Sequence, residues 1–235
     1  MAFIEKLKAY GNKHKCLLSV YRATLGKLKT KYFFDYQRRA LQRNGLRLIS
    51  NISDALTKHG AVFFLDFGSL LGVVRDGRLI AHDRDIDFGV YFDDNFTPAV
   101  LDQAMKEIGL KRVHTFLFRG DVKEVTYSSG VTHIDFFKHE ETETETMDYS
   151  FHRLPDEPYE TDNQYSVTRG HSVHISGVKT IKISNYTLRI PENEEAYLES
   201  VYTAAWRVPN PKWTSRNNPG RQEKFPGEYG IKIKG

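Results

Sequence analysis

The feature that most constrains this chain is a row of three aspartates at alternate positions, Asp83, Asp85 and Asp87. Residues 83–92 alternate with a period of two, which predicts a strand. Alternate side chains of a strand share one face, with Cα atoms ~6.6 Å apart, and the intervening apolar residues point into the core. Carboxylates at this spacing can hold one cation, and without it they repel one another. Because all the ligands are oxygens, the pattern favours Mg²⁺ or Mn²⁺ over zinc.

A second element, Gly68-Ser69, follows the apolar run 61–65, which suits a buried strand, and precedes a short helix expected over 70–75. Glycine lets the backbone approach a ligand, and a helix N-terminus offers free N–H groups to a phosphate. Alone the pair is weak evidence, because serine is also a common N-cap. The spacing strengthens it, because phosphate donors and metal ligands then meet at one end of a sheet. Asp66 is expected only to cap this helix.

A third element is Asp135, which lies between apolar neighbours in the strand-like run 131–138. A lone buried aspartate is costly unless it is paired or bound to a metal. We therefore expect Asp135 to complete the metal site with Asp85 and Asp87 and to accept a proton from an attacking hydroxyl. A purely structural aspartate, hydrogen-bonded to backbone, is the alternative that stays open.

The rest of the chain supplies elements around this centre. Two helices are expected at the N-terminus, with a break at Gly11-Asn12 in the first. The acidic stretch Glu140–Asp148 is interpreted as a solvated loop, and the tail after Pro209 as extended or loosely ordered. The expected helices cover residues 3–28, 32–58, 98–108 and 192–206, and further strands cover 111–118, 122–127 and parts of 164–190.

Charge is distributed unevenly along the chain. The formal net charge is +4, but residues 1–60 carry thirteen Lys/Arg against three acidic residues. A basic first third suggests an anionic partner, either a membrane leaflet or a polyanionic acceptor, although an ordinary amphipathic helix would look the same. A polyanion-binding module is therefore a competing interpretation. The segment lacks the arrangement of a known DNA or RNA motif, so no nucleic-acid partner is expected.

Compartment and redox chemistry follow from what the sequence lacks. No run approaches the ~20 apolar residues of a membrane span, and the N-terminus lacks the apolar region of a secretory signal. We expect a cytoplasmic protein, with peripheral contact at the inner face of the membrane. The single cysteine, Cys16, rules out an intrachain disulfide and a cysteine zinc cluster.

The central motifs resemble those of a known family. Gly68-Ser69-Leu-Leu-Gly72-Val-Val-Arg75, followed by Asp83-Arg-Asp85-Ile-Asp87, is similar to the signature of the LicD/fukutin family of the nucleotidyltransferase-fold superfamily. The similarity continues from Pro191 to Pro209. His82 stands where that family usually has Trp, and Thr203 stands where it usually has Gly.

The resemblance implies an α+β fold, with a nucleotidyltransferase-like mixed β-sheet flanked by helices. Together with the charge and composition of the flanking segments, which the resemblance does not cover, this predicts a basic helical segment (1–58) packed on a catalytic domain (59–210), followed by a Pro/Gly-rich basic tail (211–235). The resemblance further implies an EC 2.7-class phosphotransferase. Such an enzyme moves ribitol phosphate, glycerol phosphate or phosphocholine from a CDP-linked donor to a glycan or lipid-linked glycan, in making or decorating capsule or teichoic-acid polysaccharide.

The resemblance also assigns roles to residues. Asp85 and Asp87 would hold Mg²⁺ or Mn²⁺ on the donor pyrophosphate, and Asp135 would help to activate the acceptor hydroxyl. Gly68 and Ser69 would contact a phosphate. Further contacts to the donor or the metal would come from Arg75, Arg78 and Asp83. A true nucleotidyltransferase, which leaves a nucleoside monophosphate on its acceptor, needs the same carboxylates and stays open as the alternative.

Overall fold

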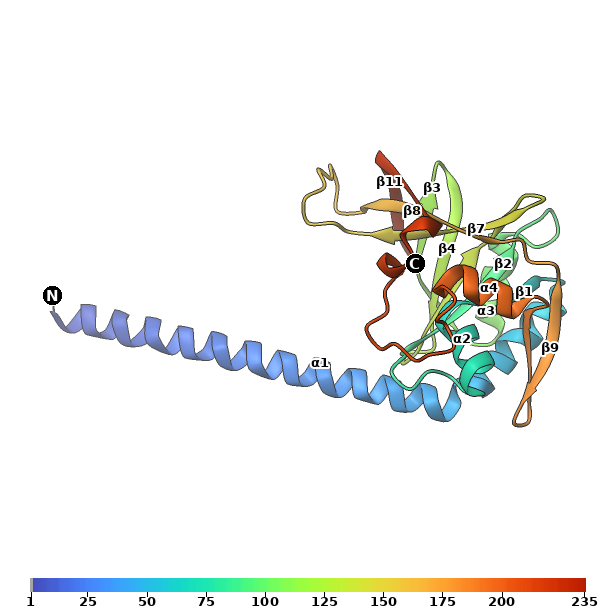
Figure 1. Cartoon of the computed structure of the whole chain (residues 1–235). Helices are drawn as coiled ribbons and strands as arrows, with labels where there is room; N and C mark the ends of the chain where they lie inside the picture. Colours follow the sequence, from blue (N-terminus) through green and yellow to red (C-terminus); the bar gives the residue numbers. More distant parts are fainter. Residues whose placement is uncertain (1) are drawn as a thin grey trace.

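The computed structural model describes the backbone of residues 2–235 and the side chains of residues 30–215 and 217–235. The chain is α+β, and Figure 1 shows its helices set against a large curled sheet. The elements are α1 (Ala2–Lys58), β1 (Val62–Leu65), α2 (Phe67–Asp76), β2 (Asp85–Tyr91), α3 (Pro98–Glu107), β3 (Lys111–Phe118), β4 (Asp121–Ser128), β5 (His133–Lys138), β6 (Glu140–Glu141), β7 (Glu145–His152), β8 (Gln164–Val173), β9 (Val178–Ile183), β10 (Tyr186–Pro191), α4 (Glu194–Tyr202), η1 (Ser215–Asn217), η2 (Pro219–Arg221) and β11 (Gln222–Lys234).

Within the described residues the main sheet has nine strands in the order β1-β2-β5-β4-β3-β11-β8-β7-β6, and β9 and β10 form a separate hairpin. Neighbouring strands of the main sheet are antiparallel except β2 and β5, which run parallel. A parallel pair cannot be joined by a tight turn, so the chain between β2 and β5 makes a longer excursion through α3, β3 and β4. The fold class expected from the sequence, a mixed sheet flanked by helices, is confirmed.

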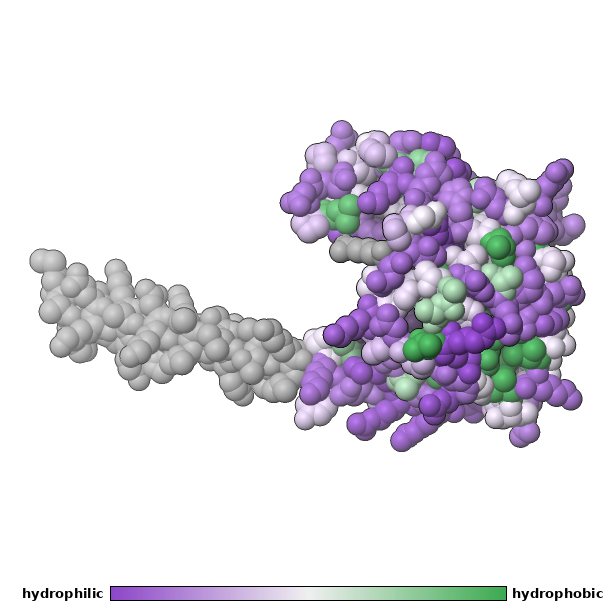
Figure 2. All heavy atoms as spheres, viewed as in Figure 1, coloured by the Kyte–Doolittle hydropathy of each residue, from purple (hydrophilic) through white to green (hydrophobic). Residues whose placement is uncertain are grey.

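The hydrophobic core lies between the helices and the sheet. Leu41, Ile49, Ile52 and Leu56 recur at three- and four-residue steps along α1 and are buried, as the helical period requires. They belong to one cluster with the inward residues of β1, β2 and β5. The face seen in Figure 2 is mainly hydrophilic with small apolar patches, so most of the large apolar side chains are inside.

The N-terminal helix differs from expectation. One continuous helix, Ala2–Lys58, replaces the two predicted helices, and the predicted break at Gly11-Asn12 is wrong. A single glycine or asparagine inside a long helix costs only about 1 kcal/mol or less, which does not force a break. Among the residues that the structure describes, no helix combines the length and the apolar character needed to cross a membrane. The sequence also predicts a basic face on residues 3–28. Those side chains lie outside the described part of the chain, so this prediction stays untested.

The acidic stretch Glu140–Asp148 is not a loop, which corrects the sequence-based expectation. Its residues form β6 and the start of β7, and Thr146 and Asp148 are buried. The stretch alternates with a period of two, but the inward positions are polar. Thr146 stabilises its burial by accepting a hydrogen bond from the backbone N–H of Ile175 at 3.1 Å.

The C-terminal segment is also more ordered than predicted. Instead of a loose tail, residues 222–234 form β11, which lies between β3 and β8 inside the main sheet. A register shift between Lys224 and Tyr229 marks an irregularity of the strand that contains Pro226 and Gly227. Pro226 and Gly227, two of the residues that suggested a loose tail, therefore lie at an irregular point of a long strand.

Because β11 bridges two halves of the sheet, deleting residues 222–235 should abolish cooperative unfolding rather than shorten a dispensable tail. Removing an inner strand leaves the hydrogen-bonding edges of β3 and β8 unpaired. Circular dichroism melting of the truncated and full chains tests this. A truncated protein that melts cooperatively at the full-length temperature would contradict the placement of β11.

Candidate active site

The aspartates singled out in the sequence lie side by side on neighbouring strands. β2 and β5 pair in parallel, and their register places Asp87 directly opposite Asp135 and Asp85 opposite His133. Asp85 and Asp87 share one face of β2, because side chains two apart in a strand point the same way. The expected juxtaposition of Asp85, Asp87 and Asp135 is therefore found, whereas their role as metal ligands stays a prediction.

The electrostatics of this group are unfavourable without a cation. Burial raises the pKa of Asp87 well above its usual range, and the like charges of Asp85 and Asp135 add to the effect. Burial also raises the pKa of Asp135 to about 7, even though a hydrogen bond from Thr126 opposes the shift. Carboxylates in such surroundings resist ionisation until a positive charge comes close.

Asp83 differs from its expected position. β2 begins at Asp85, so Asp83 lies in the turn before the strand rather than on the strand face. Its carboxylate nevertheless approaches the group, because a Cβ on Gly68 would lie 2.9 Å from Asp83 and 3.5 Å from Asp87. The pKa of Asp83 is raised to about 6, mainly by burial and to a smaller extent by the charge of Asp85. Only a glycine at position 68 leaves room for both carboxylates.

The turn that carries Gly68 and Ser69 is fixed to β2. Ser69 is buried, and its Oγ accepts a hydrogen bond from the backbone N–H of Asp87 at 3.0 Å. The backbone N–H of Asp66 donates to the carbonyl of Asp87, also at 3.0 Å. Ser69 therefore links the start of α2 to the carboxylate strand, and its O–H can still donate to a phosphate.

Asp66 caps α2, as expected, and also centres a buried network that the sequence did not reveal. Its Oδ1 accepts from the Phe67 N–H and from the Tyr197 hydroxyl, both at 2.7 Å, and its Oδ2 lies 2.7 Å from Nε2 of His139. Asp66, His139 and Tyr197 are fully buried. This network holds Phe67 at a positive φ of 38° directly before Gly68, a strained conformation that persists only where surrounding contacts enforce it.

A cavity of about 870 Å³ opens beside the carboxylates, with Gly68 and Asp83 in its wall. Arg75 and Arg78 line it from α2 and the following loop. Arg75 holds Asp76 through two hydrogen bonds of 2.9 and 2.8 Å, which raises the pKa of Arg75 further and offsets part of its charge. The exposed Arg78 approaches because Gly72 lets the loop pass close to α2, where a Cβ would meet the Arg78 carbonyl at 2.7 Å.

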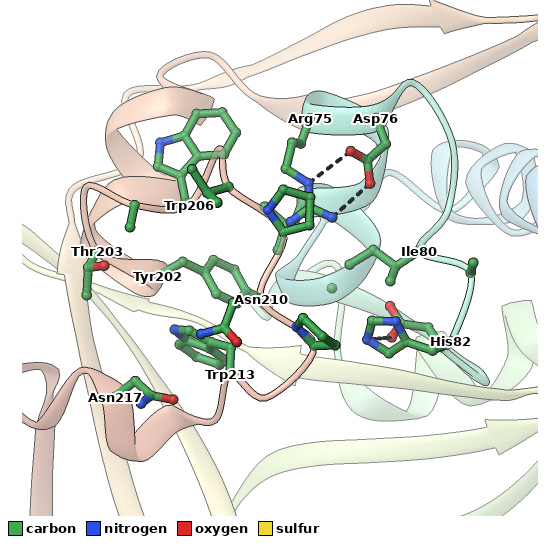
Figure 3. A pocket seen from close by; sticks show the side chains of 18 of the residues that line it. Arg75, Asp76, Ile80, His82, Tyr202, Thr203, Trp206, Asn210, Trp213 and Asn217 are labelled. Atoms are coloured by element: carbon green, nitrogen blue, oxygen red, sulfur yellow. Dashed lines mark hydrogen bonds and ion pairs between the residues drawn. The ribbon is translucent and has the colours of Figure 1, made fainter.

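The opposite wall of the cavity is aromatic. Figure 3 shows Tyr202, Trp206 and Trp213 along one side, across from Arg75 and His82. The indole N–H groups of Trp206 and Trp213 are buried and have no hydrogen-bond partner among the described residues. A cavity with aromatic faces and two guanidinium groups suits a ligand with a flat ring and phosphates.

An ion pair between the acidic stretch Glu140–Asp148 and the C-terminal segment lies next to the turn that carries Gly68. Arg221, from η2, donates to the carboxylate of Asp148 on β7. The Arg221 guanidinium also lies 5.8 Å from the centre of the Phe67 ring. The C-terminal segment is therefore tied directly to the residue that precedes Gly68.

The donor set fits Mg²⁺ or Mn²⁺ in kind, because every expected ligand atom is a carboxylate oxygen. Among the side chains that the structure describes, no three His, Cys, Asp or Glu residues form a ready ligand group around one point. Mg²⁺ commonly takes one or two carboxylates and completes its shell with water and substrate phosphates. The arrangement fits that kind of site rather than a closed protein cage.

The region that contains this site matches a known protein family. The sequence model described as "LicD/FKTN/FKRP, nucleotidyltransferase domain" matches residues 60–193, more than half of the chain. The chain belongs to the LicD family. The matched region contains the Gly68-Ser69 turn, the aspartates of β2 and Asp135, so this LicD-family domain includes the whole carboxylate group described above.

Curated relatives and solved structures give more distant similarities. The chain is 22% identical over 185 residues to "Ribitol-5-phosphate transferase FKTN" of Homo sapiens and of Macaca fascicularis. These matches cover 77% of this chain but only 37% of each relative, so the chain spans little more than a third of their length. A crystal structure of ANT(2")-Ia with adenylyl-2"-tobramycin is 14% identical, with a TM-score of 0.41 over 74% of this chain and 83% of that one. A solution structure of ANT(2'')-Ia is 15% identical, with a TM-score of 0.43 over 77% and 82%.

The raised pKa values predict how stability depends on pH when no divalent cation is present. Asp135 has a pKa of about 7 when folded, against an ordinary value of 3.8, so the folded protein keeps a proton that the unfolded chain releases. The free energy of unfolding should therefore fall as the pH rises from about 4 to about 7. Urea unfolding across this window measures the slope. The variant Asp135→Asn should show a shallower slope, and an unchanged slope would contradict the assignment.

Thr203 predicts a stabilising substitution. It has φ 72° and ψ 170° at the end of α4, a conformation that a β-branched residue adopts only under strain. Thr203→Gly should raise the free energy of unfolding by about 1 kcal/mol, because the relief of strain exceeds the entropy that glycine costs. Thr187→Gly, at an exposed position of β10, is the matched control and should destabilise instead. Thermal melting in which Thr203→Gly also destabilises would refute the strain.

Proposed function

We propose that this LicD-family chain transfers a phosphorylated alditol or phosphocholine from a CDP-linked donor to the hydroxyl of a glycan, with Mg²⁺ or Mn²⁺ as its cofactor. The observation that carries the proposal is the in-register pair Asp87 and Asp135 beside Asp85. Family membership supports the class of reaction. The printed name of the relatives, ribitol-5-phosphate transferase, supports ribitol phosphate as the first group to test.

The donor is proposed to occupy the cavity beside Gly68. Its volume of about 870 Å³ is in the range of sites for nucleotide-sized ligands. Trp206 and Trp213, whose rings line the cavity, would contact the base. Arg75 and Arg78 would hold the phosphates, with the free N–H groups at the start of α2 as further donors.

Phosphoryl transfer depends on positioning and charge neutralisation more than on covalent chemistry by the protein. Mg²⁺ or Mn²⁺ bound by carboxylates of the group Asp85, Asp87 and Asp135, with water and donor phosphates completing its shell, would supply positive charge to the donor pyrophosphate. Asp135 would accept the proton of the attacking glycan hydroxyl. The new bond joins that oxygen to the phosphorus of the transferred group, and the phosphoanhydride bond breaks to release CMP.

Membrane contact is a further part of the proposal. Tyr32, Phe33 and Tyr36 on α1 are 73%, 50% and 57% exposed, in a helix that also carries exposed Arg39 and Arg43. Aromatic and basic side chains together favour the interface of an anionic leaflet. These residues support peripheral contact, which would bring a lipid-linked glycan acceptor to the enzyme.

The main alternative is a nucleotidyltransferase, which would add a nucleoside monophosphate to its acceptor. The same carboxylates and the same cavity would serve both reactions, so product mass decides between them. A polyanion-binding module without catalysis is the second alternative. It predicts salt-dependent oligonucleotide binding and no binding of a CDP-linked donor.

The function is tested by a donor screen with the full chain, Mg²⁺ and an oligosaccharide acceptor, followed by mass spectrometry. CDP-ribitol, CDP-glycerol and CDP-choline are the three donors. Asp87→Asn should lower turnover roughly 10³-fold or more, because it weakens the charge clamp on the donor. It should not destabilise the protein, because it removes like-charge repulsion. Asp94→Asn, at an exposed position before α3, is the matched control and should retain activity.

Full activity of Asp87→Asn would overturn the proposed site. A product heavier by one nucleoside monophosphate would instead favour the alternative reaction.

A further inference from the structure

A hydrogen-bonded chain crosses three strands and ends on Asp135. β4 lies between β5 and β3, and the register sets Thr126 opposite both Asp135 and His114. The Thr126 Oγ1 lies 2.5 Å from Asp135 Oδ1 and 3.0 Å from His114 Nε2. Thr126 is 1% exposed, so water does not replace these contacts. The chain is a direct product of strand pairing, because the three side chains share one face of the sheet.

The direction of each hydrogen bond follows from simple counting. With a cation at the site Asp135 is ionised, and an ionised carboxylate only accepts, so the single hydroxyl hydrogen of Thr126 then points to Asp135. The Thr126 oxygen must then accept from Nε2–H of His114, which makes that nitrogen the protonated one in a neutral ring. Nδ1 of His114 is buried without a partner among the described residues, and as a bare acceptor it costs less than an unpaired N–H. Glu124 flanks Nε2 at 3.7 Å and favours a hydrogen there.

The hydroxyl of Thr126 is not needed for packing. Valine has nearly the same shape, suits an inner strand and carries no polar group that burial would penalise. A buried threonine hydroxyl at this position therefore serves the polar groups it contacts, which are the carboxylate of Asp135 and the imidazole of His114.

We propose that Thr126 and His114 are positioning residues that fix the carboxylate of Asp135, holding Oδ1 so that Oδ2 faces the substrate and the cation. The inference rests on the proposed function and adds to it the residues that orient its base. Groups that orient a ligand carboxylate commonly affect metal affinity or activity by about 10- to 100-fold when removed. Neither residue touches substrate, and both act through Asp135.

Two substitutions at one position test this in the full-length protein. Thr126→Val removes the hydroxyl and keeps the shape, whereas Thr126→Ser keeps the hydroxyl. The first readout, independent of activity, is the Mn²⁺ concentration that gives half of the maximal rise in Tm. The second is the division between kcat and donor KM. Thr146→Val is the structural control, because it removes an equally buried hydroxyl that bonds only outside the carboxylate group.

Thr126→Val should need about 10- to 100-fold more Mn²⁺ and lose kcat by a similar factor with donor KM little changed. Thr126→Ser should keep a Mn²⁺ midpoint and a kcat close to those of wild type. His114→Phe should change both quantities less than Thr126→Val does. Thr146→Val should lower Tm without moving the Mn²⁺ midpoint. If wild type responds to Mn²⁺ and transfers but Thr126→Val matches it within twofold, only this inference fails. If wild type shows neither response nor transfer, the proposed function fails and this inference with it.

Discussion

The structure depends on the parallel pairing of β2 with β5, which forces two carboxylates together. The register that sets Asp87 opposite Asp135 also sets Phe88 opposite Phe136, whose rings stack at 5.2 Å on the core side. A slip of one residue would turn the aspartates into the core and the phenylalanines out of it. Aromatic packing on one face therefore stabilises a register whose other face is electrostatically unfavourable. Such strain is typical of sites whose binding partner supplies the missing charge.

The second constraint is the position of the turn before α2. Asp66 is held by His139, which follows β5, and by Tyr197 on α4, so elements distant in the sequence fix one residue. Through Phe67 and Ser69 this fixes the start of α2 against β2. The cavity beside Gly68 and the carboxylates consequently share a wall fixed by these contacts, which is what the proposed positioning of a phosphate requires.

The sequence predicted the parts of the site that obey local rules. Period-two alternation located Asp85 and Asp87, and burial cost singled out Asp135. The contributions of Thr126, His114 and His139 could not be predicted, because they follow from which strands are neighbours, and one sequence does not show that. Asp148 and Arg221 were missed for a different reason. Charge and Pro/Gly content indicated solvent exposure, whereas pairing with each other allows Asp148 to be buried and Arg221 to be largely buried.

The fold was predictable in class but not in extent. Helix and strand periods gave most elements, yet the sequence did not show that β11 enters the sheet between β3 and β8. Strand pairing over more than a hundred residues leaves no periodic signal in the strand itself. The aromatic wall was missed for the same reason. Trp206 and Trp213 line the same cavity as Arg75 only because the chain returns to α2 in the fold.

The proposed metal site at Asp87 and Asp135 is tested most directly by a crystal structure of the full chain with Mn²⁺ and CDP, in which anomalous scattering locates the metal. We expect an anomalous peak within coordination distance of Asp87 and Asp135, with the pyrophosphate of CDP beside Gly68. A nucleotide bound elsewhere, or a metal peak that contacts neither aspartate, would contradict it.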